Sequence, residues 1–141
     1  MGNLRTVRLS PSYTVAIPAD VTEENDGRVC SFWRQGEPLL LQLSSYLRTE
    51  GEQSSAHARL QERIKRSSGN RLTLAENLHP DRAIDQATAE QLDDKRVLWV
   101  HTYLVWPHLT VYALISGPEP LVRDASNWAA KAIASLALVV H

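Results

Sequence analysis

The sequence predicts an α+β fold, a single-domain sandwich with a mostly antiparallel sheet flanked by helices. Two segments with the period-2 alternation of β-hairpins, 28–48 and 98–116, are separated by a segment with helical periodicity, and a second helical segment closes the chain. This order of strands and helices is typical of α+β sandwiches. The chain of 141 residues, 43% of them hydrophobic, has the size and composition of one domain covering residues 1–141.

Charge and cysteine content limit the classes of function. The 15 lysines and arginines against 16 acidic residues leave a net charge of -1. No overall field therefore attracts nucleic acid, and we expect no nucleic-acid partner. The single cysteine, Cys30, excludes an internal disulfide and a multi-thiolate metal site, which fits a reducing compartment. The N-terminus lacks the apolar segment of a signal peptide, so we expect a cytoplasmic location.

The first elements are expected to be two short strands. The stretches "LRTVRL" and "SYTVAIP" alternate apolar and polar residues and are joined near Pro11. Pro18 ends the second strand because it cannot donate to a ladder of hydrogen bonds. The acidic stretch "TEEND", residues 22–26, predicts a solvated loop.

A hairpin is predicted in "GRVCSFWRQGEPLLLQLSSYLR", with strands Arg28–Arg34 and Glu37–Arg48 joined at Gln35-Gly36. Pairing Arg34 with Glu37 gives the hairpin an aliphatic face and a mixed face of aromatic and polar residues. The aliphatic face holds Cys30, Phe32, Leu39, Leu41 and Leu43, and the mixed face holds Trp33, Leu40, Gln42, Ser44 and Tyr46.

The segment "SSAHARLQERIKRS" predicts an amphipathic helix. Ser54 or Ser55 is its N-cap, and Ala56, Leu60 and Ile64 form one apolar stripe. Basic residues gather toward its end, and we interpret them as a solvated helix face or as a surface for an acidic partner. They are Arg59, Arg63, Lys65, Arg66 and Arg71.

The segment 71–96 has the composition of a helix, but Asp93-Asp94-Lys95 is also a suitable turn into the next strand. We favour a strand.

The stretch "VLWVHTYLVWPHLTVYALISGP" is almost long enough to cross a bilayer. Pro107 would break a spanning helix, and His101 and His108 would be costly in hydrocarbon. We therefore predict no membrane insertion and a hairpin of Leu98–Val105 and Leu109–Ser116. A four-residue turn at 106–109 would pair Val105 with Thr110, Tyr103 with Tyr112 and His101 with Leu114. One face would carry Leu98, Val100, Thr102, Leu104, Val111, Ala113 and Ile115, and the other Trp99, His101, Tyr103, Val105, Thr110, Tyr112, Leu114 and Ser116.

The last element is predicted to be one long amphipathic helix, Leu121–Leu136, started by Pro118 or Pro120. Its apolar stripe includes Trp128, which we expect to be largely buried against the sheet.

The whole chain resembles the Mog-like and PsbP-like domains, including their bacterial members of unknown function. The resemblance is carried by a "VAIP" strand, the "GRVCSFWRQGEPLLLQLSSYL" hairpin, the helix after it, the "LWVHTYLVWPHLTVYALIS" hairpin and the terminal "IASLAL". It implies a central antiparallel sheet flanked by helices. It also implies protein binding, since members of the family bind a small GTPase, photosystem II or apolar segments of secretion effectors. The family has no shared catalytic residues.

Little else in the sequence suggests chemistry. The histidines His57, His79, His101 and His108 include no HExxH pair, and no nucleophile, phosphate loop or carboxylate pair is recognisable. Cys30 is expected to be a small buried hydrophobe. We therefore predict a protein that is not an enzyme and that uses neither a cofactor nor a metal.

The mixed face of the sheet is the best candidate for a functional site, because aromatic side chains with polar tips recur in protein-binding surfaces. The expected partner is another protein, for example an apolar segment of one, and the chain would act as an adaptor or chaperone-like module. If the first helix covers this face, the same residues are core, and the burial of Trp99 and Tyr103 decides between the two. A small-ligand-binding protein or hydrolase with a cleft near His101 and a structural homo-oligomer, such as a homodimer, are the alternatives. The candidate partner-binding residues are Trp33, Gln42, Tyr46, Trp99, His101, Tyr103 and Tyr112.

Overall fold

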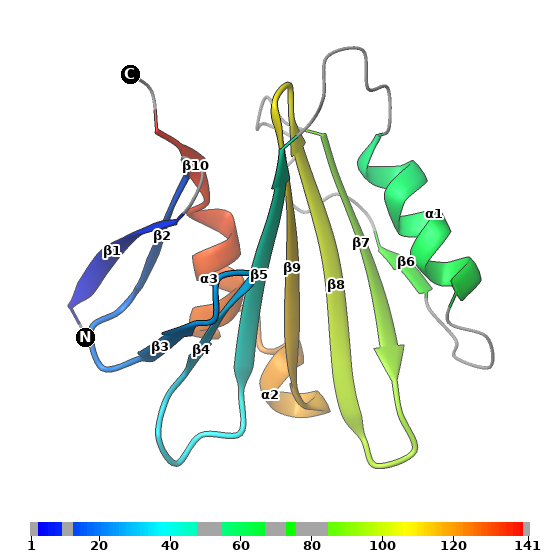
Figure 1. Cartoon of the computed structure of the whole chain (residues 1–141). Coiled ribbons are helices and arrows are strands. Elements are labelled where there is room, and N and C mark those ends of the chain that lie inside the picture. Colours follow the sequence, from blue (N-terminus) through cyan, green and yellow to red (C-terminus); the bar gives the residue numbers. More distant parts are fainter. Residues whose placement is uncertain (1–2, 10–12, 48–54, 67–72, 76–84, 140–141) are drawn as a thin grey trace.

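The computed structural model describes residues 3–9, 13–47, 55–66, 73–75 and 85–139. Within them the strands form a three-stranded sheet of order β1-β2-β10 and a seven-stranded sheet of order β3-β4-β5-β9-β8-β7-β6, and every strand pair is antiparallel (Figure 1). The predicted α+β sandwich is confirmed. The strands are β1 (Leu4–Leu9), β2 (Tyr13–Pro18), β3 (Thr22–Asn25), β4 (Val29–Trp33), β5 (Leu40–Leu47), β6 (Thr73–Ala75), β7 (Asp85–Leu92), β8 (Val97–Trp106), β9 (Leu109–Pro118) and β10 (Ala137–Leu138), and the helices are α1 (Ala56–Arg66), α2 (Glu119–Arg123) and α3 (Trp128–Ala134).

The large sheet is covered differently on its two faces. The small sheet and α3 lie on one side of it and α1 on the other (Figure 1). The larger core cluster joins the small sheet and α3 to the aliphatic face of the large sheet, and it includes Tyr13, Ile17, Phe32, Leu41 and Leu136. Full burial of each such side chain contributes about 1.5–3 kcal/mol, so this side supplies most of the hydrophobic stabilisation.

The β8–β9 hairpin agrees with the prediction. The strands pair Val105 with Thr110, Tyr103 with Tyr112 and His101 with Leu114, and the pair Trp106–Leu109 closes a turn over residues 107–108. Alternation of β-branched and aromatic residues fixes this register because a slip by one residue would move every side chain to the wrong face. None of the helices in the described residues is long and apolar enough to cross a membrane.

The β4–β5 hairpin turns where predicted, but its strands are paired differently. The Glu37 N–H donates to the Arg34 carbonyl at 3.1 Å, yet the first strand pair is Trp33 with Leu40, so the predicted register is wrong by two residues. Pro38 has no N–H for the ladder, and the Glu37 carboxylate accepts a hydrogen bond from the Trp128 indole at 2.6 Å. Both features take residues 37–39 out of the strand. A shift by two leaves each side chain on its predicted face.

Residues 22–25, predicted to be a loop, form the edge strand β3. The turn after it is held by Asp26, whose side chain accepts hydrogen bonds from the N–H groups of Arg28 and Val29, and by Gly27 at φ 92°. Arg5 of β1 pairs with Glu23 at 2.7 Å. A short, exposed and charged strand suits a sheet edge, where charge opposes association with other chains.

The middle of the chain contains strands β6 and β7, as we favoured, whereas residues 76–84 lie outside the described part. Strand β7 turns directly into β8: the Asp93 carboxylate accepts hydrogen bonds from the N–H groups of Lys95 and Val97 at 2.9 Å, and Arg96 adopts φ 65°. Residues 86–89 are buried on both faces of the strand. A strand that is buried on both faces does not need alternating apolar and polar residues, so the sequence does not show the period-2 pattern here.

Helix α1 begins as predicted. The Ser55 hydroxyl accepts a hydrogen bond from the Ala58 N–H at 3.0 Å, and Ala56 and Leu60 are buried. The Ala56 N–H also donates to the Asp85 carboxylate at 2.7 Å, which fixes the start of the helix beside β7. The predicted residues Ser54 and Arg71, and the side chains of Ile64 and Arg66, lie outside the described part.

The long C-terminal helix Leu121–Leu136 was a wrong prediction. The chain forms α2 and α3 instead, with a break at 124–127, and then the short strand β10. Asn127 causes the break, because its side chain caps α3 by accepting from the Ala130 N–H at 2.7 Å and donates to the carbonyls of Val122 and Asp124 at 2.9 Å. Trp128 is largely buried, as expected.

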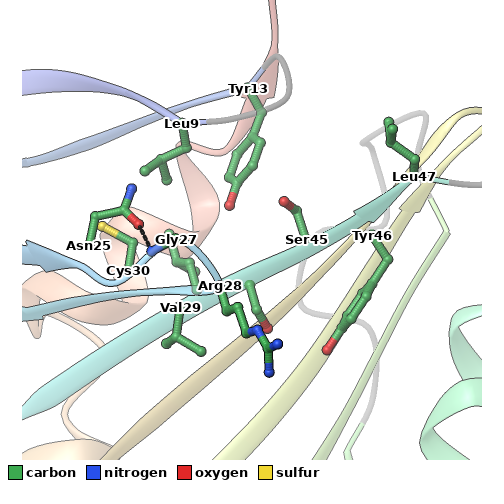
Figure 2. A pocket seen from close by; sticks show the side chains of 12 residues that line it. Leu9, Tyr13, Asn25, Gly27, Arg28, Val29, Cys30, Ser45, Tyr46 and Leu47 are labelled. Atoms are coloured by element: carbon green, nitrogen blue, oxygen red, sulfur yellow. Dashed lines mark hydrogen bonds between the residues drawn. The ribbon is translucent and has the colours of Figure 1, made fainter.

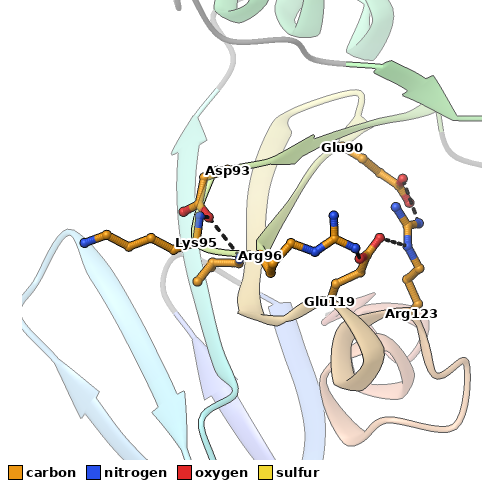
Figure 3. A network of polar contacts seen from close by, with 7 residues as sticks. Glu90, Asp93, Lys95, Arg96, Glu119 and Arg123 are labelled. Atoms are coloured by element: carbon orange, nitrogen blue, oxygen red, sulfur yellow. Dashed lines mark hydrogen bonds and ion pairs between the residues drawn. The ribbon is translucent and has the colours of Figure 1, made fainter.

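An ion-pair network fixes α2 against the end of the β7–β8 hairpin (Figure 3). Arg123 lies between two carboxylates, 2.9 Å from Glu119 and 3.1 Å from Glu90, and Arg96 pairs with Glu119. The two positive and two negative charges balance, which suits a structural role better than recruitment of a charged ligand.

Candidate functional site

The candidate residues from the sequence share one face of the large sheet. The strand registers across β4, β5, β9 and β8 place their side chains in rows. Successive rows are Trp33, Leu40, Ser116 and Trp99; Ser31, Gln42, Leu114 and His101; Val29, Ser44, Tyr112 and Tyr103; and Tyr46, Thr110 and Val105.

Helix α1 divides this mixed face into a covered and an open half. The helix packs on β7 and β8 and leaves His101, Tyr103 and Tyr112 only 8%, 6% and 9% exposed. Three of the seven candidate residues therefore belong to the core beneath α1 and are not available at the surface. The two residues whose burial was to decide between a surface and a core give different answers: Tyr103 is buried, whereas Trp99 is half-buried.

Arg63 of α1 explains why polar aromatic residues are accepted under the helix. Its Nε donates to the Tyr103 hydroxyl at 2.9 Å, and its guanidinium carbon lies 4.0 Å from the centre of the Tyr112 ring. This cation–π contact and the hydrogen bond satisfy groups that would otherwise be desolvated without a partner. The sequence did not reveal this pairing, because the two residues are 40 positions apart.

The imidazole of His101 is held neutral. Its Nδ1 lies 2.6 Å from the Tyr112 hydroxyl. Burial, and then the charge of Arg63, lower the pKa of His101 to about 4, while burial raises the pKa of Tyr112 to about 12. The charged group acting on the ring is thus a cation and not the carboxylate that would prepare a histidine for general base catalysis near neutral pH.

The open half of the mixed face lies over β4, β5 and the ends of β8 and β9. Its two tryptophans, Trp33 and Trp99, end one row and are both half-buried. The Trp99 indole donates to the Asp93 carboxylate at 3.3 Å, and the Gln42 amide donates to the Ser31 hydroxyl at 3.3 Å. Tyr46, at the far end, is 48% exposed. The open half comprises Val29, Ser31, Trp33, Leu40, Gln42, Ser44, Tyr46, Trp99 and Leu114.

Within the described residues, the remaining histidines and the cysteine do not form a chemical site. His57 and His108 are exposed and distant in sequence, and His79 lies outside the described residues. Cys30 is buried, and burial raises the pKa of its thiol to about 11, so the thiolate is suppressed. Among the described residues, no three His, Cys, Asp or Glu side chains are grouped to hold a metal ion.

A pocket of about 730 Å³ was not predicted from the sequence (Figure 2). It forms because β5 continues for three residues, Ser45–Leu47, beyond Ser44, its last partner of β4. The predicted hairpin also had strands of unequal length, but the sequence did not show that Leu9 and Tyr13 of the small sheet border the free end of β5. The pocket is lined by Leu9, Tyr13, Asn25, Gly27, Arg28, Val29, Cys30, Leu43, Ser44, Ser45, Tyr46 and Leu47.

Comparison with known proteins establishes the fold. No family model and no curated protein matches the chain. The solution structure of cyanobacterial PsbP (CyanoP) from Synechocystis sp. PCC 6803 is similar with a TM-score of 0.71 and 12% sequence identity, over 98% of this chain and 94% of that one. A crystal structure from Bacteroides thetaiotaomicron VPI-5482 is similar with a TM-score of 0.65 and 14% identity, over 99% of this chain and 49% of that one. The chain therefore has a PsbP-like fold.

Proposed function

We propose that this protein is a non-catalytic adaptor or chaperone-like module of the cytoplasm that binds an apolar segment of another protein on the open half of the mixed face. The observation that carries the proposal is a row of side chains across the sheet with a half-buried indole at each end. The row consists of Trp33, Leu40, Ser116 and Trp99. Large rigid aromatic side chains give contact area with little loss of conformational entropy, and tryptophans are enriched among the residues that dominate binding energy.

The polar groups of the open half support the same function. Gln42 and Ser31 are hydrogen-bonded to each other, and the Trp99 indole is bonded to Asp93. These bonds satisfy part of the hydrogen-bonding capacity of the groups, which lowers the cost of desolvating them when a partner removes water. A surface that alternates indole, leucine and amide groups can hold an apolar segment and remain soluble without it.

Site-specific photo-cross-linking in the native host tests the proposal. A photoreactive phenylalanine analogue at Gln42 should give a cross-linked product with one or a few partners, whereas the same analogue at exposed Thr6 of the small sheet should not. The double substitution Trp33→Ala and Trp99→Ala should remove the Gln42 product, while Leu4→Ala, at an exposed leucine of β1, should leave it unchanged. Thermal unfolding verifies that each variant is folded.

The cross-linked product also distinguishes the alternatives. A cross-linked product with twice the mass of the chain would contradict the adaptor function and indicate a homodimer that uses the same face. Identical products at Gln42 and Thr6 would exclude the open half as the binding site. The hydrolase alternative requires solvent access to His101, which α1 covers.

A further inference from the structure

The pocket at the end of β4 connects the two faces of the large sheet. Leu9, Tyr13 and Leu43 line it on the side of the small sheet, whereas Ser44 and Tyr46 point to the mixed face. Adjacent residues of β5 alternate between the faces, and no residue of β4 stands opposite Ser45–Leu47. The space beside these three residues therefore leads from the core side to the mixed face.

The inner part of the pocket is lined mainly by apolar side chains. Leu9, Tyr13, Cys30 and Leu43 are all buried in the main core cluster. The Tyr13 hydroxyl is hydrogen-bonded to Ser45, and burial raises the pKa of Tyr13 to about 12, so the hydroxyl stays neutral. A chamber with these walls favours a hydrocarbon chain over a charged group.

The outer mouth carries the opposite chemistry. In Figure 2 the Arg28 guanidinium and the Tyr46 hydroxyl point in the same direction, away from Tyr13. In the part of the chain that the structure describes, the Arg28 side chain has neither an ion pair nor a hydrogen bond, and the Ser44 hydroxyl has no hydrogen bond. The charges of Asp26 and Arg28 attract each other, but the two side chains form no ion pair, and the Asp26 carboxylate accepts two backbone N–H groups instead. A guanidinium that makes no ion pair within the described residues, beside two hydroxyls, is suited to a carboxylate.

We propose that this pocket binds a small amphiphilic carboxylate, with its hydrocarbon chain between Leu9 and Leu43 and its carboxylate at Arg28. The volume of about 730 Å³ lies within the range of about 300–1,000 Å³ that is typical of small-ligand sites. Apolar walls with a few convergent polar groups are the usual composition of such sites. The pocket shares Val29, Ser44 and Tyr46 with the open half, but neither Trp33 nor Trp99 lines it, so the two sites rest on different anchoring residues.

Three ligands distinguish the contributions of the carboxylate and of the hydrocarbon chain to binding. Decanoate, decanol and acetate are titrated, below the micellar range, into the ¹⁵N-labelled protein, and backbone amide shifts are followed by NMR. We expect saturable decanoate binding with the largest shifts at Tyr13, Leu43 and Ser45. Decanol should bind about tenfold more weakly, because it lacks the charge-assisted hydrogen bonds. Acetate should give no saturable shift at these amides, because it lacks the chain.

Arg28→Gln tests the head group, with Arg8→Gln as the matched control at an exposed arginine that does not line the pocket. Arg28→Gln should weaken decanoate binding about tenfold and leave decanol binding unchanged, whereas Arg8→Gln should change neither. Equal affinities for decanoate and decanol, or equal effects of the two arginine substitutions, would overturn the assignment of the carboxylate to Arg28. Absence of saturable decanoate shifts at the pocket in the folded wild-type protein would overturn the site itself.

Discussion

The buried imidazole of His101 links stability to pH at the scale of one residue. The folded protein holds its pKa near 4, compared with a value of 6.5 for a free histidine. Above pH 6.5 both folded and unfolded chains carry the neutral ring, so this group makes no difference. As the pH falls from about 6.5 to about 4, the unfolded chain takes up the proton first, and the free energy of unfolding decreases by about 3 kcal/mol in total.

The measurement is urea unfolding between pH 7 and pH 4 of wild type, His101→Gln and His57→Gln. The unfolding free energy of the His101→Gln variant should decrease much less than that of wild type between about pH 6.5 and pH 4. His57 is exposed, and its substitution should preserve the wild-type profile. A His101→Gln profile parallel to that of wild type would show that the imidazole is not the titrating group.

Gly117 shows how one missing side chain positions a loop. A Cβ atom at this position of β9 would lie 2.6 Å from the Pro38 carbonyl oxygen, and that oxygen is a backbone atom. Gly117→Ala must displace either β9 or the loop 34–39, and we expect it to lower the free energy of unfolding by about 1–3 kcal/mol, as overpacking does. Chemical unfolding measures the loss. An unfolding free energy within about 0.5 kcal/mol of wild type would mean that the loop moves freely.

At the scale of elements, Asn127 is predicted to hold α2 and α3 apart as two helices. Asn127→Ala removes the cap of α3 and two hydrogen bonds donated by the side-chain amide, one buried and one partly buried, so we expect a loss of about 2–3 kcal/mol in unfolding free energy. Asn127→Asp keeps the capping acceptor but cannot donate to Val122 and Asp124, and it should lose less. Thermal or urea unfolding of the two variants gives this order. Equal losses would indicate that the cap contributes nothing.

The same segment shows why elements differ in predictability. The β8–β9 register followed from alternation and from Pro107, both of which are local signals. The predicted apolar stripe from Leu121 to Leu136 is also present in the structure, since Trp128, Ala129, Ala132 and Leu136 are buried. The break depends on side-chain bonds of Asn127 that a stripe does not encode. The β4–β5 register likewise depended on Glu37 contacting a tryptophan 91 positions away.

At the scale of the whole molecule, the sequence predicted which residues share a face but not what covers that face. Period-2 alternation placed Trp33, Gln42, Tyr46 and Trp99 together with His101. A register error of two residues does not change this result, because alternate residues of a strand lie on the same face. Whether α1 packs over β7 and β8 or over β5 depends on long-range contacts such as that between Arg63 and Tyr112. Three of the seven candidate residues therefore belong to the core. The pocket beside β5 escaped prediction for the same reason, since its walls combine Leu9 and Tyr13 of the small sheet with residues of β4 and β5.

Trp128 connects the C-terminal helix to the first hairpin, and we expect it to be the residue on which the assembly of the two sheets depends most. Its side chain is 8% exposed, and its indole donates to Glu37 at 2.6 Å. Trp128→Ala should lower the free energy of unfolding by about 3–5 kcal/mol, because it leaves a large cavity between α3 and the sheet. Glu37→Gln keeps the shape of the acceptor without its charge and should lose only about 1 kcal/mol.

Urea unfolding of these variants, followed by hydrogen exchange of the β2 and β4 amides, measures the effect. If α3 unites the two sheets, Trp128→Ala should increase exchange in both β2, which α3 contacts, and β4, which it reaches through the loop carrying Glu37. Increased exchange in β2 alone would mean that the hairpin loop is held by contacts other than the one between Trp128 and Glu37. A loss below about 1 kcal/mol for Trp128→Ala would contradict its place in the core, since large-to-small substitutions of buried aromatic residues cost several times more.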